Sequence, residues 1–191
     1  MTTAVKSGRQ RSQAADDAIL TATLDVLRQH GYQALTISAV IERSGVSSAT
    51  LYRRWPDKQA LVVAALRTLT ADLTCSDTGT LAGDVESLVK RMARAMATPD
   101  DLFAVLATEV KHNDELRAMN RVAFIEPRLG QVKAILDRAV ARGELVDRPA
   151  DDVALSLITG PLYHRAFVLG EKLTPSFQRT VVHHVLAGLG Q

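Results

Sequence analysis

The sequence has almost no cysteine and no long apolar run, and both absences narrow the class of protein. Cys75 is the single cysteine among 191 residues, which excludes an intramolecular disulfide and a zinc site built from several cysteines. No run of about 18 consecutive apolar residues occurs, so we expect no transmembrane helix. The first residues also lack the apolar core of a signal peptide. We therefore expect a protein of the reducing cytoplasm.

Motifs that carry enzyme chemistry are missing as well. The sequence holds no glycine-rich phosphate loop, no nucleophile elbow and no His/Glu spacing typical of a catalytic metal site. His183 and His184 are adjacent, so on a helix their side chains point about 100° apart and form a poor chelate. Glu109 and His112 have the spacing to share a metal ion, but isolated pairs of this kind are usually surface residues. We predict no enzymatic activity, no cofactor and no metal.

Aromatic residues make up only 4% of the sequence, whereas hydrophobic residues of all kinds make up 47%. A chain of this length and composition can bury a substantial core. Helix formers dominate and strand patterns are absent, which predicts an all-α fold. Glycine, proline and polar breaks divide the chain into about nine expected helices, at residues 14–30, 36–44, 47–54, 58–72, 81–97, 100–111, 114–141, 150–169 and 175–189.

Positive charge is concentrated toward the N-terminus. Residues 1–60 hold eight Lys or Arg and five Asp or Glu, while the remaining residues carry a small negative excess. A basic surface is what phosphate neutralisation on nucleic acid requires. Residues 1–13 have no periodicity and include Lys6, Arg9 and Arg11, so we expect a flexible basic arm. Such an arm is a plain disordered tail or a segment that enters the DNA minor groove, and both hold if the arm becomes ordered only on DNA.

Residues 36–58 carry the pattern of two short helices joined by a glycine turn. Thr36 is a typical helix N-cap, and Leu35 with Val40 forms a hydrophobic staple around it. Ser47 repeats the device in front of the second helix, and Gly45 supplies the left-handed backbone that the turn needs. Pro56 then stops the second helix, and Asp57 caps the next one. Capping alone favours an ordinary helical hairpin that has a solvated, charged face.

The outward face of the second short helix has the chemistry of a DNA-reading surface. With Leu51 and Trp55 on the inner side, the outer side presents Ala49 and Arg53, flanked by Thr50 and Tyr52. A small residue permits close approach, Arg can donate two hydrogen bonds to guanine, and hydroxyls can bind phosphates. The candidate DNA-binding residues are Thr36, Ser47, Ser48, Ala49, Thr50, Tyr52, Arg53, Arg54 and Lys58.

This string resembles the DNA-binding domain of the TetR family of transcriptional regulators. The resemblance rests on Gly45-Val46-Ser47, on Thr50-Leu51-Tyr52, on the aromatic Trp55 and on Lys58 followed by Ala60-Leu61. It implies that the helix holding Tyr52 reads bases, that Tyr52 and Lys58 hold phosphates, and that Thr36 and Thr50 contact the DNA backbone. The sequence departs from the family pattern at Trp55, where Phe is usual, at Ile41, where Ala is usual, and at Ser48, where Lys is frequent.

The second half resembles the C-terminal ligand and dimer domain of one large TetR subgroup. This resemblance rests on Arg138-Ala139, Gly143-Glu144-Leu145, Asp151 and residues 160–173. The resemblance implies a homodimer formed by the last two long helices and an effector site among the preceding ones. Candidate effector-binding residues are Met92, Met96, Phe103, Met119, Phe124, Tyr163, His164 and Phe167. Each apolar one is more simply explained as core, and the polar ones fit a ligand contact or a dimer rim equally well.

These observations predict three segments and one function. Residues 1–13 form the arm, residues 14–60 the helix-turn-helix domain, and residues 61–191 the effector-binding and dimerisation domain. The expected function is a sequence-specific DNA-binding regulator, a repressor that a small molecule releases from a palindromic operator. The alternative is a helical small-molecule-binding or protein-interaction module with no DNA role.

Overall fold

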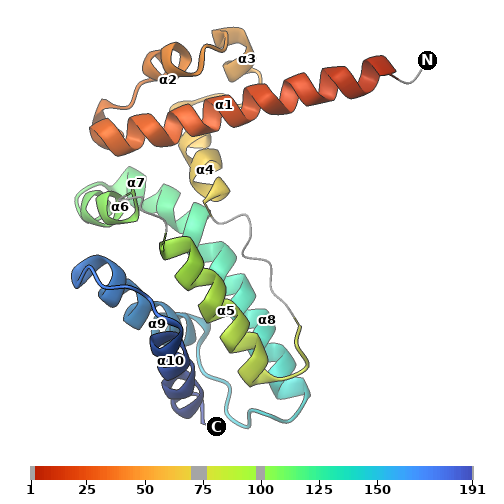
Figure 1. Cartoon of the computed structure of the whole chain (residues 1–191), viewed down its shortest axis with the longest axis vertical. Coiled ribbons are helices and arrows are strands. Elements are labelled where there is room, and N and C mark those ends of the chain that lie inside the picture. Colours follow the sequence, from red (N-terminus) through yellow and green to blue (C-terminus); the bar gives the residue numbers. More distant parts are fainter. Residues whose placement is uncertain (1–2, 70–76, 98–101, 191) are drawn as a thin grey trace. The chain divides into compact units, whose positions relative to one another are not determined.

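The protein is all-helical in the part of the chain that the computed structural model describes, which is residues 3–69, 77–97 and 102–190 (Figure 1). It divides into two compact units. The first unit comprises Met1–Leu69 and Ala104–Ala123, and the second comprises Thr70–Phe103 and Phe124–Gln191. No helix among the described residues has the length and apolar character needed to cross a bilayer.

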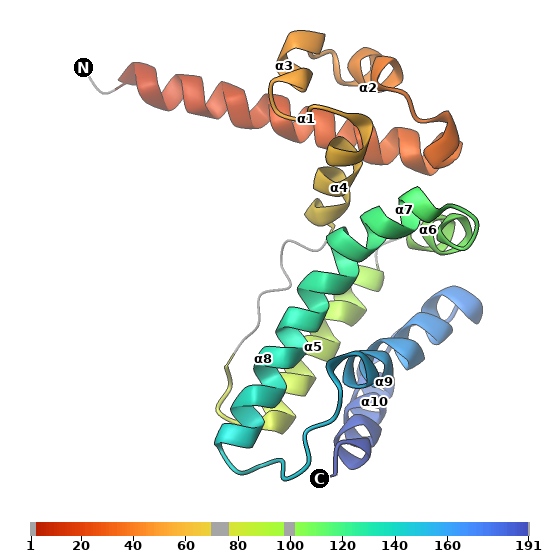
Figure 2. The ribbon, with the colours of Figure 1, turned by 180° about the vertical axis from the view of Figure 1, so that it is seen from behind.

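The first unit is built around one long helix. Helices α2 and α3 lie along one side of α1 in both views (Figures 1 and 2), and α1 also packs against α4. The helices of this unit are α1 (Thr3–Ala34), α2 (Ile37–Ser44), α3 (Ser48–Tyr52), α4 (Lys58–Thr68), most of α6 (Leu102–Val110) and α7 (Asp114–Asn120). Its buried side chains include Ile19, Leu27, Leu35, Val40, Leu51, Leu61 and Leu66.

The second unit is a bundle of long helices. Helix α5 packs against α8, α9 and α10, and α5 and α8 run side by side in both views (Figures 1 and 2). The helices are α5 (Leu81–Met96), α8 (Glu126–Ala141), α9 (Asp151–Tyr163) and α10 (Pro175–Gly188), with π-helical turns η1 (Arg121–Ile125) and η2 (His164–Val168). Its core includes Leu88, Val89, Met92, Ile135, Leu136, Ile158, Leu162, Val181 and Val185.

Nine helices are present in the described residues, as the sequence predicts, and α1 is kinked at Gly31, whose backbone is not helical. Helix α7, turn η1 and α8 form one uninterrupted helix, and α9 continues into η2 in the same way. The all-α fold is therefore confirmed. Predicted helix ends agree with the observed ones to within a few residues, as in α5 and α10.

Two helices differ clearly from their predicted lengths. Helix α1 begins at Thr3, so it includes most of the segment 1–13 that we expected as a flexible arm; Lys, Arg, Gln and Ala in that segment are good helix formers. Helix α3 ends at Tyr52 and not at Arg54, because Pro56 follows and disfavours helical backbone just before it. The end predicted for α4, Asp72, lies outside the described residues.

The predicted caps of the first unit are confirmed. Thr36 accepts a hydrogen bond from the Ala39 amide at 3.2 Å, and Asp57 accepts one from the Ala60 amide at 2.8 Å. Gly45 has φ of +67° and ends α2 in the left-handed region. These local bonds fix where α2 and α4 begin, and thereby the position of α3 between them.

A buried carboxylate ties α5 to α8 in the second unit. Asp84 is fully buried and accepts hydrogen bonds from the Thr78 amide at 2.7 Å and the Thr78 hydroxyl at 2.8 Å. Arg138 of α8 forms an ion pair with it at 2.9 Å. Glu144 accepts a 2.6 Å hydrogen bond from the Leu81 amide at the start of α5. The carboxylate therefore fixes the N-terminal turn of α5 against the C-terminal part of α8.

Candidate functional site

Helix α3 presents one buried and one exposed face. Leu51 is fully buried and anchors the helix to the core of the first unit. The next residue, Tyr52, is 53% exposed, and Arg53, Ala49 and Ser48 are exposed with it. Burial of a single large apolar residue is enough to fix which side of so short a helix faces outward. The exposed face therefore combines an aromatic hydroxyl, a guanidinium and two small residues.

The hydroxyl groups at the start of α3 are partly engaged within the chain. Ser47 caps the helix by accepting a hydrogen bond from the Thr50 amide at 3.4 Å, and the two side-chain hydroxyls lie 3.0 Å apart. Thr36 caps α2 while remaining exposed. A capping hydroxyl retains one free lone pair or its proton, so these groups can still contact a phosphate oxygen.

Arg54 differs from its neighbour Arg53 because its guanidinium is bound within the protein. Its guanidinium forms an ion pair with Asp16 of α1 and donates a 2.6 Å hydrogen bond to the Ser12 hydroxyl. Another donor reaches the Thr50 carbonyl at 3.4 Å. Arg54 thus links the end of α3 to α1, whereas Arg53 points into solvent.

Lys58, the first residue of α4, is held by the end of α1. Its ammonium group donates a 2.7 Å hydrogen bond to the Tyr32 carbonyl and lies 4.0 Å from the centre of the Tyr32 ring. An ammonium group over an aromatic face is attracted by the ring quadrupole. It has three N–H donors, so the contact to the carbonyl leaves others for a further partner.

Tyr32 is the centre of a network that the sequence did not indicate. Its hydroxyl donates a 2.6 Å hydrogen bond to Glu115 of α7, and its amide donates a 2.9 Å hydrogen bond to Glu109 of α6. Gln59 donates a second hydrogen bond to Glu115 at 2.7 Å. These bonds lower the pKa of Glu115, with the Tyr32 hydroxyl as the largest cause. Burial, then Glu115, raises the pKa of the Tyr32 phenol.

The candidate effector-binding residues belong to both units, Met119 to the first and the others to the second. Met92 is fully buried in the core of the second unit, whereas Met96 lines a cavity of about 510 Å³ together with residues of η2 and the following loop. The aromatic rings of Tyr163 and Phe167 lie 5.0 Å apart, and His164 beside them is exposed. Phe124 is buried in the second unit.

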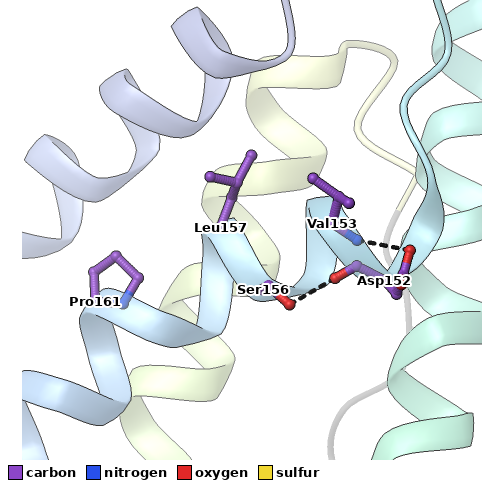
Figure 3. A pocket seen from close by; sticks show the side chains of 5 residues that line it. All are labelled: Asp152, Val153, Ser156, Leu157 and Pro161. Atoms are coloured by element: carbon purple, nitrogen blue, oxygen red, sulfur yellow. Dashed lines mark hydrogen bonds between the residues drawn. The ribbon is translucent and has the colours of Figure 1, made fainter.

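Two candidates remain, Met119 and Phe103. Met119 is buried in the first unit. Phe103 belongs to α6, but its side chain lies outside the described part of the structure. A second hollow, of about 350 Å³, is lined by α9, where Val153, Leu157 and Pro161 project from one side of the helix (Figure 3).

Tyr32, Glu109, Glu115 and Arg128 are the residues that sequence reasoning missed. Tyr32 forms hydrogen bonds with two glutamates that lie more than 70 positions away in the sequence, and no local sequence pattern predicts such contacts. Arg128 does leave a local signal. It stands at a position of α8 that continues the apolar spacing of Val132, Ile135 and Ala139.

Comparison with known proteins agrees with this architecture. The family model described as "Bacterial regulatory proteins, tetR family" matches residues 19–65, and the one described as "Tetracyclin repressor-like, C-terminal domain" matches residues 75–185. The chain is 30% identical over 186 residues to the uncharacterized HTH-type transcriptional regulator YdeS of Bacillus subtilis, covering 96% of this chain and 94% of that one.

Two further relatives match over almost their full length. The DNA-binding transcriptional repressor TetR of Mycobacteroides abscessus is 33% identical over 183 residues, with 92% of this chain and 94% of the relative covered. The crystal structure of the TetR family transcription regulator SCO0332 superposes with a TM-score of 0.68 at 25% identity, covering 91% of this chain and 97% of that one. The chain therefore belongs to the TetR family of helix-turn-helix transcriptional regulators.

Proposed function

We propose that the protein is a homodimeric repressor that binds a palindromic operator and leaves it when a small molecule binds the second unit. The observation that carries the proposal is the outward face of α3, where Tyr52 and Arg53 are exposed while Leu51 is fully buried. The relative from Mycobacteroides abscessus is named a DNA-binding transcriptional repressor, which supports repression as the mode of action.

The DNA contacts are of two kinds, contacts to base edges and contacts to phosphates. Arg53, with Ala49 and Ser48 beside it, reads base edges in the major groove, because these side chains lie on the exposed face of α3. Phosphates are held by Tyr52 and Lys58, with help from the hydroxyls of Thr36, Ser47 and Thr50. Arg54, which is paired with Asp16, holds α3 in place for the other residues. The DNA-binding domain then corresponds to residues 14–60.

The second unit also supplies the surface for dimerisation. Val153 is 51% exposed and Leu157 is 38% exposed on the same side of α9 (Figure 3). Exposed apolar side chains gathered on one helix face are typical of a protein interface. A two-fold pair places two α3 helices at half-sites about one turn of DNA, or a multiple of it, apart.

The effector acts by shifting the population of two conformations. The cavity beside Met96 and the Tyr163–Phe167 ring pair support a site in the second unit for a mainly apolar molecule. A ligand that binds the DNA-incompetent conformation about a hundredfold more tightly shifts the equilibrium by roughly 3 kcal/mol. Helix α4 is the expected lever, because it begins at Lys58 and packs against α1 and α7.

Selection of bound sequences from random DNA with the full chain tests DNA recognition. We expect a palindrome whose half-sites are spaced by about 10 base pairs or a multiple of that. Recovery of no enriched sequence would favour a helical module without a DNA role. Recovery of a single, unrepeated half-site would reject the two-fold arrangement.

Sedimentation of charge-introducing variants tests the dimer separately. Leu157→Glu, alone or with Val153→Glu, is expected to give a monomer, because each places a charge in an apolar interface. Val146→Glu is the matched control, since Val146 is 95% exposed and lies outside α9. A dimer that persists in the double variant would move the interface to another surface.

A further inference from the structure

Arg128 occupies a position on α8 that the helix otherwise gives to apolar residues. It shares one helix face with Val132, Ile135 and Ala139, all of which belong to the hydrophobic core of the second unit. Arg128 itself is only 7% exposed. A buried guanidinium is costly unless hydrogen bonds and an opposite charge compensate it, so its presence in this face calls for a partner.

The chain supplies little of that compensation. Nη1 donates a 3.0 Å hydrogen bond to the Phe124 carbonyl, and the guanidinium carbon lies 5.2 Å from the centre of the Phe124 ring. Nε is buried and donates no hydrogen bond, and among the described residues no carboxylate pairs with Arg128. Burial lowers the pKa of Arg128 to about 10, so the group keeps its positive charge at neutral pH.

We propose that Arg128 binds a carboxylate of the effector, and that the effector is a small, mainly apolar monoanion. The inference rests on the effector-controlled repressor proposed above and names the chemical class of its ligand. A guanidinium presents a planar fork of donors that fits the two oxygens of a carboxylate. In Arg128, Nη1 donates to the Phe124 carbonyl, whereas the edge of the guanidinium that includes Nε is available for a carboxylate.

The surroundings of Arg128 decide the rest of the ligand. Phe124 is one of the residues that the sequence nominated for the effector site, and it contributes both its ring and its carbonyl to Arg128. Val132, Ile135 and Ala139 on this face of α8 are apolar, and Gln131 beside them is uncharged, so α8 offers no counter-ion there for a second charge on the ligand. One carboxylate on an apolar body therefore fits, and a polyanion does not.

Paired ligands measured on the full chain test the inference. Octanoate is compared with 1-octanol, and 1-naphthoate with 1-naphthalenemethanol, by titration calorimetry and by the shift of the thermal unfolding midpoint. We expect at least one carboxylate to bind tenfold or more tightly than its neutral partner. Arg128→Met should abolish that preference and leave the affinity for the neutral partner unchanged. Arg94→Met, at an exposed position of α5, is the matched control and should keep the preference.

Three results would overturn the proposal. They are a wild-type protein with no carboxylate preference in either pair, an Arg128→Met variant that keeps the preference, and stabilisation by inorganic phosphate equal to that by the organic anions. Without ligand, Arg128→Met should be at least as stable as the wild type, because it removes an uncompensated buried charge. If that variant does not fold, Arg128→Lys serves instead; it keeps the charge, loses the planar fork and should weaken carboxylate binding tenfold.

DNA selection on the same preparation separates the two proposals. An enriched palindrome without any carboxylate preference would reject the ligand class and leave the repressor intact. A carboxylate preference without DNA binding would do the reverse.

Discussion

The ammonium group of Lys58 lies 4.0 Å from the centre of the Tyr32 ring and donates a 2.7 Å hydrogen bond to the carbonyl of the same residue. Tyr32 in turn bonds to Glu115 of α7 and Glu109 of α6. Tyr32 therefore contacts both Lys58, which we propose to hold a DNA phosphate, and two helices from a later part of the chain. A displacement of α6 or α7 would reach Lys58 through Tyr32.

Replacement of Lys58 by alanine should weaken binding to every DNA sequence to a similar degree. Loss of one phosphate contact lowers the slope of log affinity against log salt by about one. Tyr32→Phe is the control, because it removes the hydroxyl bond to Glu115 and leaves the ring and carbonyl that hold Lys58. Titrations at several salt concentrations measure the slopes. An unchanged slope in Lys58→Ala would remove Lys58 from the phosphate contacts.

Replacement of Arg53 by alanine should act on specificity. The expected cost is about 1–3 kcal/mol on the selected operator, with preference relaxed at one base position, since a bidentate contact to guanine is lost. Affinities for operators substituted at single positions measure both effects. Retention of all base preferences in this variant would assign base reading to Ala49 and Ser48.

Arg54→Ala should behave differently from the neighbouring substitution. It breaks the ion pair with Asp16 and the hydrogen bond to Ser12, so we expect a loss of folding stability of about 1 kcal/mol. Affinity should fall to the same extent for every DNA sequence. Chemical denaturation of Arg54→Ala, Asp16→Asn and the double variant gives the coupling energy. Additive effects in this cycle would argue against the ion pair as the link between α1 and α3.

Two glycines with similar backbone conformations offer a matched comparison. Gly31 has φ of +72° and Gly45 has φ of +67°, and an added Cβ is strained at either. At Gly45 the Cβ meets nothing within 4 Å, whereas at Gly31 it would lie 2.3 Å from Oε1 of Glu109. Gly45→Ala should therefore cost about 1 kcal/mol of folding free energy, from strain alone.

Gly31→Ala should cost roughly 1 kcal/mol more, because Glu109 must move and give up its hydrogen bond to the Tyr32 amide. The extra cost should disappear when Gly31→Ala is measured in a Glu109→Ala background. Equal costs for both glycines in the wild-type background would show that Glu109 yields freely.

Asp84 should make folding stability depend on acid pH. Burial opposes its charged form, but the hydrogen bonds from Thr78 and Arg138 outweigh burial and lower the pKa of the carboxyl. A folded-state pKa below the unfolded value of about 3.9 gives a stabilisation that is present above that pH and is lost as the pH falls through the folded-state pKa.

Asp84→Asn should thus cost about 3 kcal/mol at neutral pH, as expected for removal of one partner of a buried ion pair. The difference from the wild type should shrink below about pH 4. Asp137→Asn is the control; its ion pairs with Lys133 and Arg148 are exposed and screened by solvent, so its cost should be much smaller than that of Asp84→Asn. A cost for Asp84→Asn that is constant with pH would show that the charge of Asp84 does not matter.

The helix caps and the turn of the first unit could be predicted from the sequence. Caps at Thr36, Ser47 and Asp57 and the turn at Gly45 depend on residues only a few positions apart, and all are present as predicted. The outward direction of Tyr52 and Arg53 also followed from the sequence, because one buried Leu51 fixes the orientation of a short helix. The family assignment rests on the same string and is confirmed by the full-length relatives.

What only the tertiary structure decided are the partners of charged groups. Arg53 and Arg54 are identical in type and adjacent, yet one is exposed and the other is paired with Asp16 of a different helix. Glu109 was expected to be an ordinary surface residue, but it accepts a hydrogen bond from the Tyr32 amide, and Glu115 accepts one from the Tyr32 hydroxyl. Caps and helix faces are set by neighbours in the chain, whereas ion pairs and buried charges depend on which helices pack together, and that information is non-local.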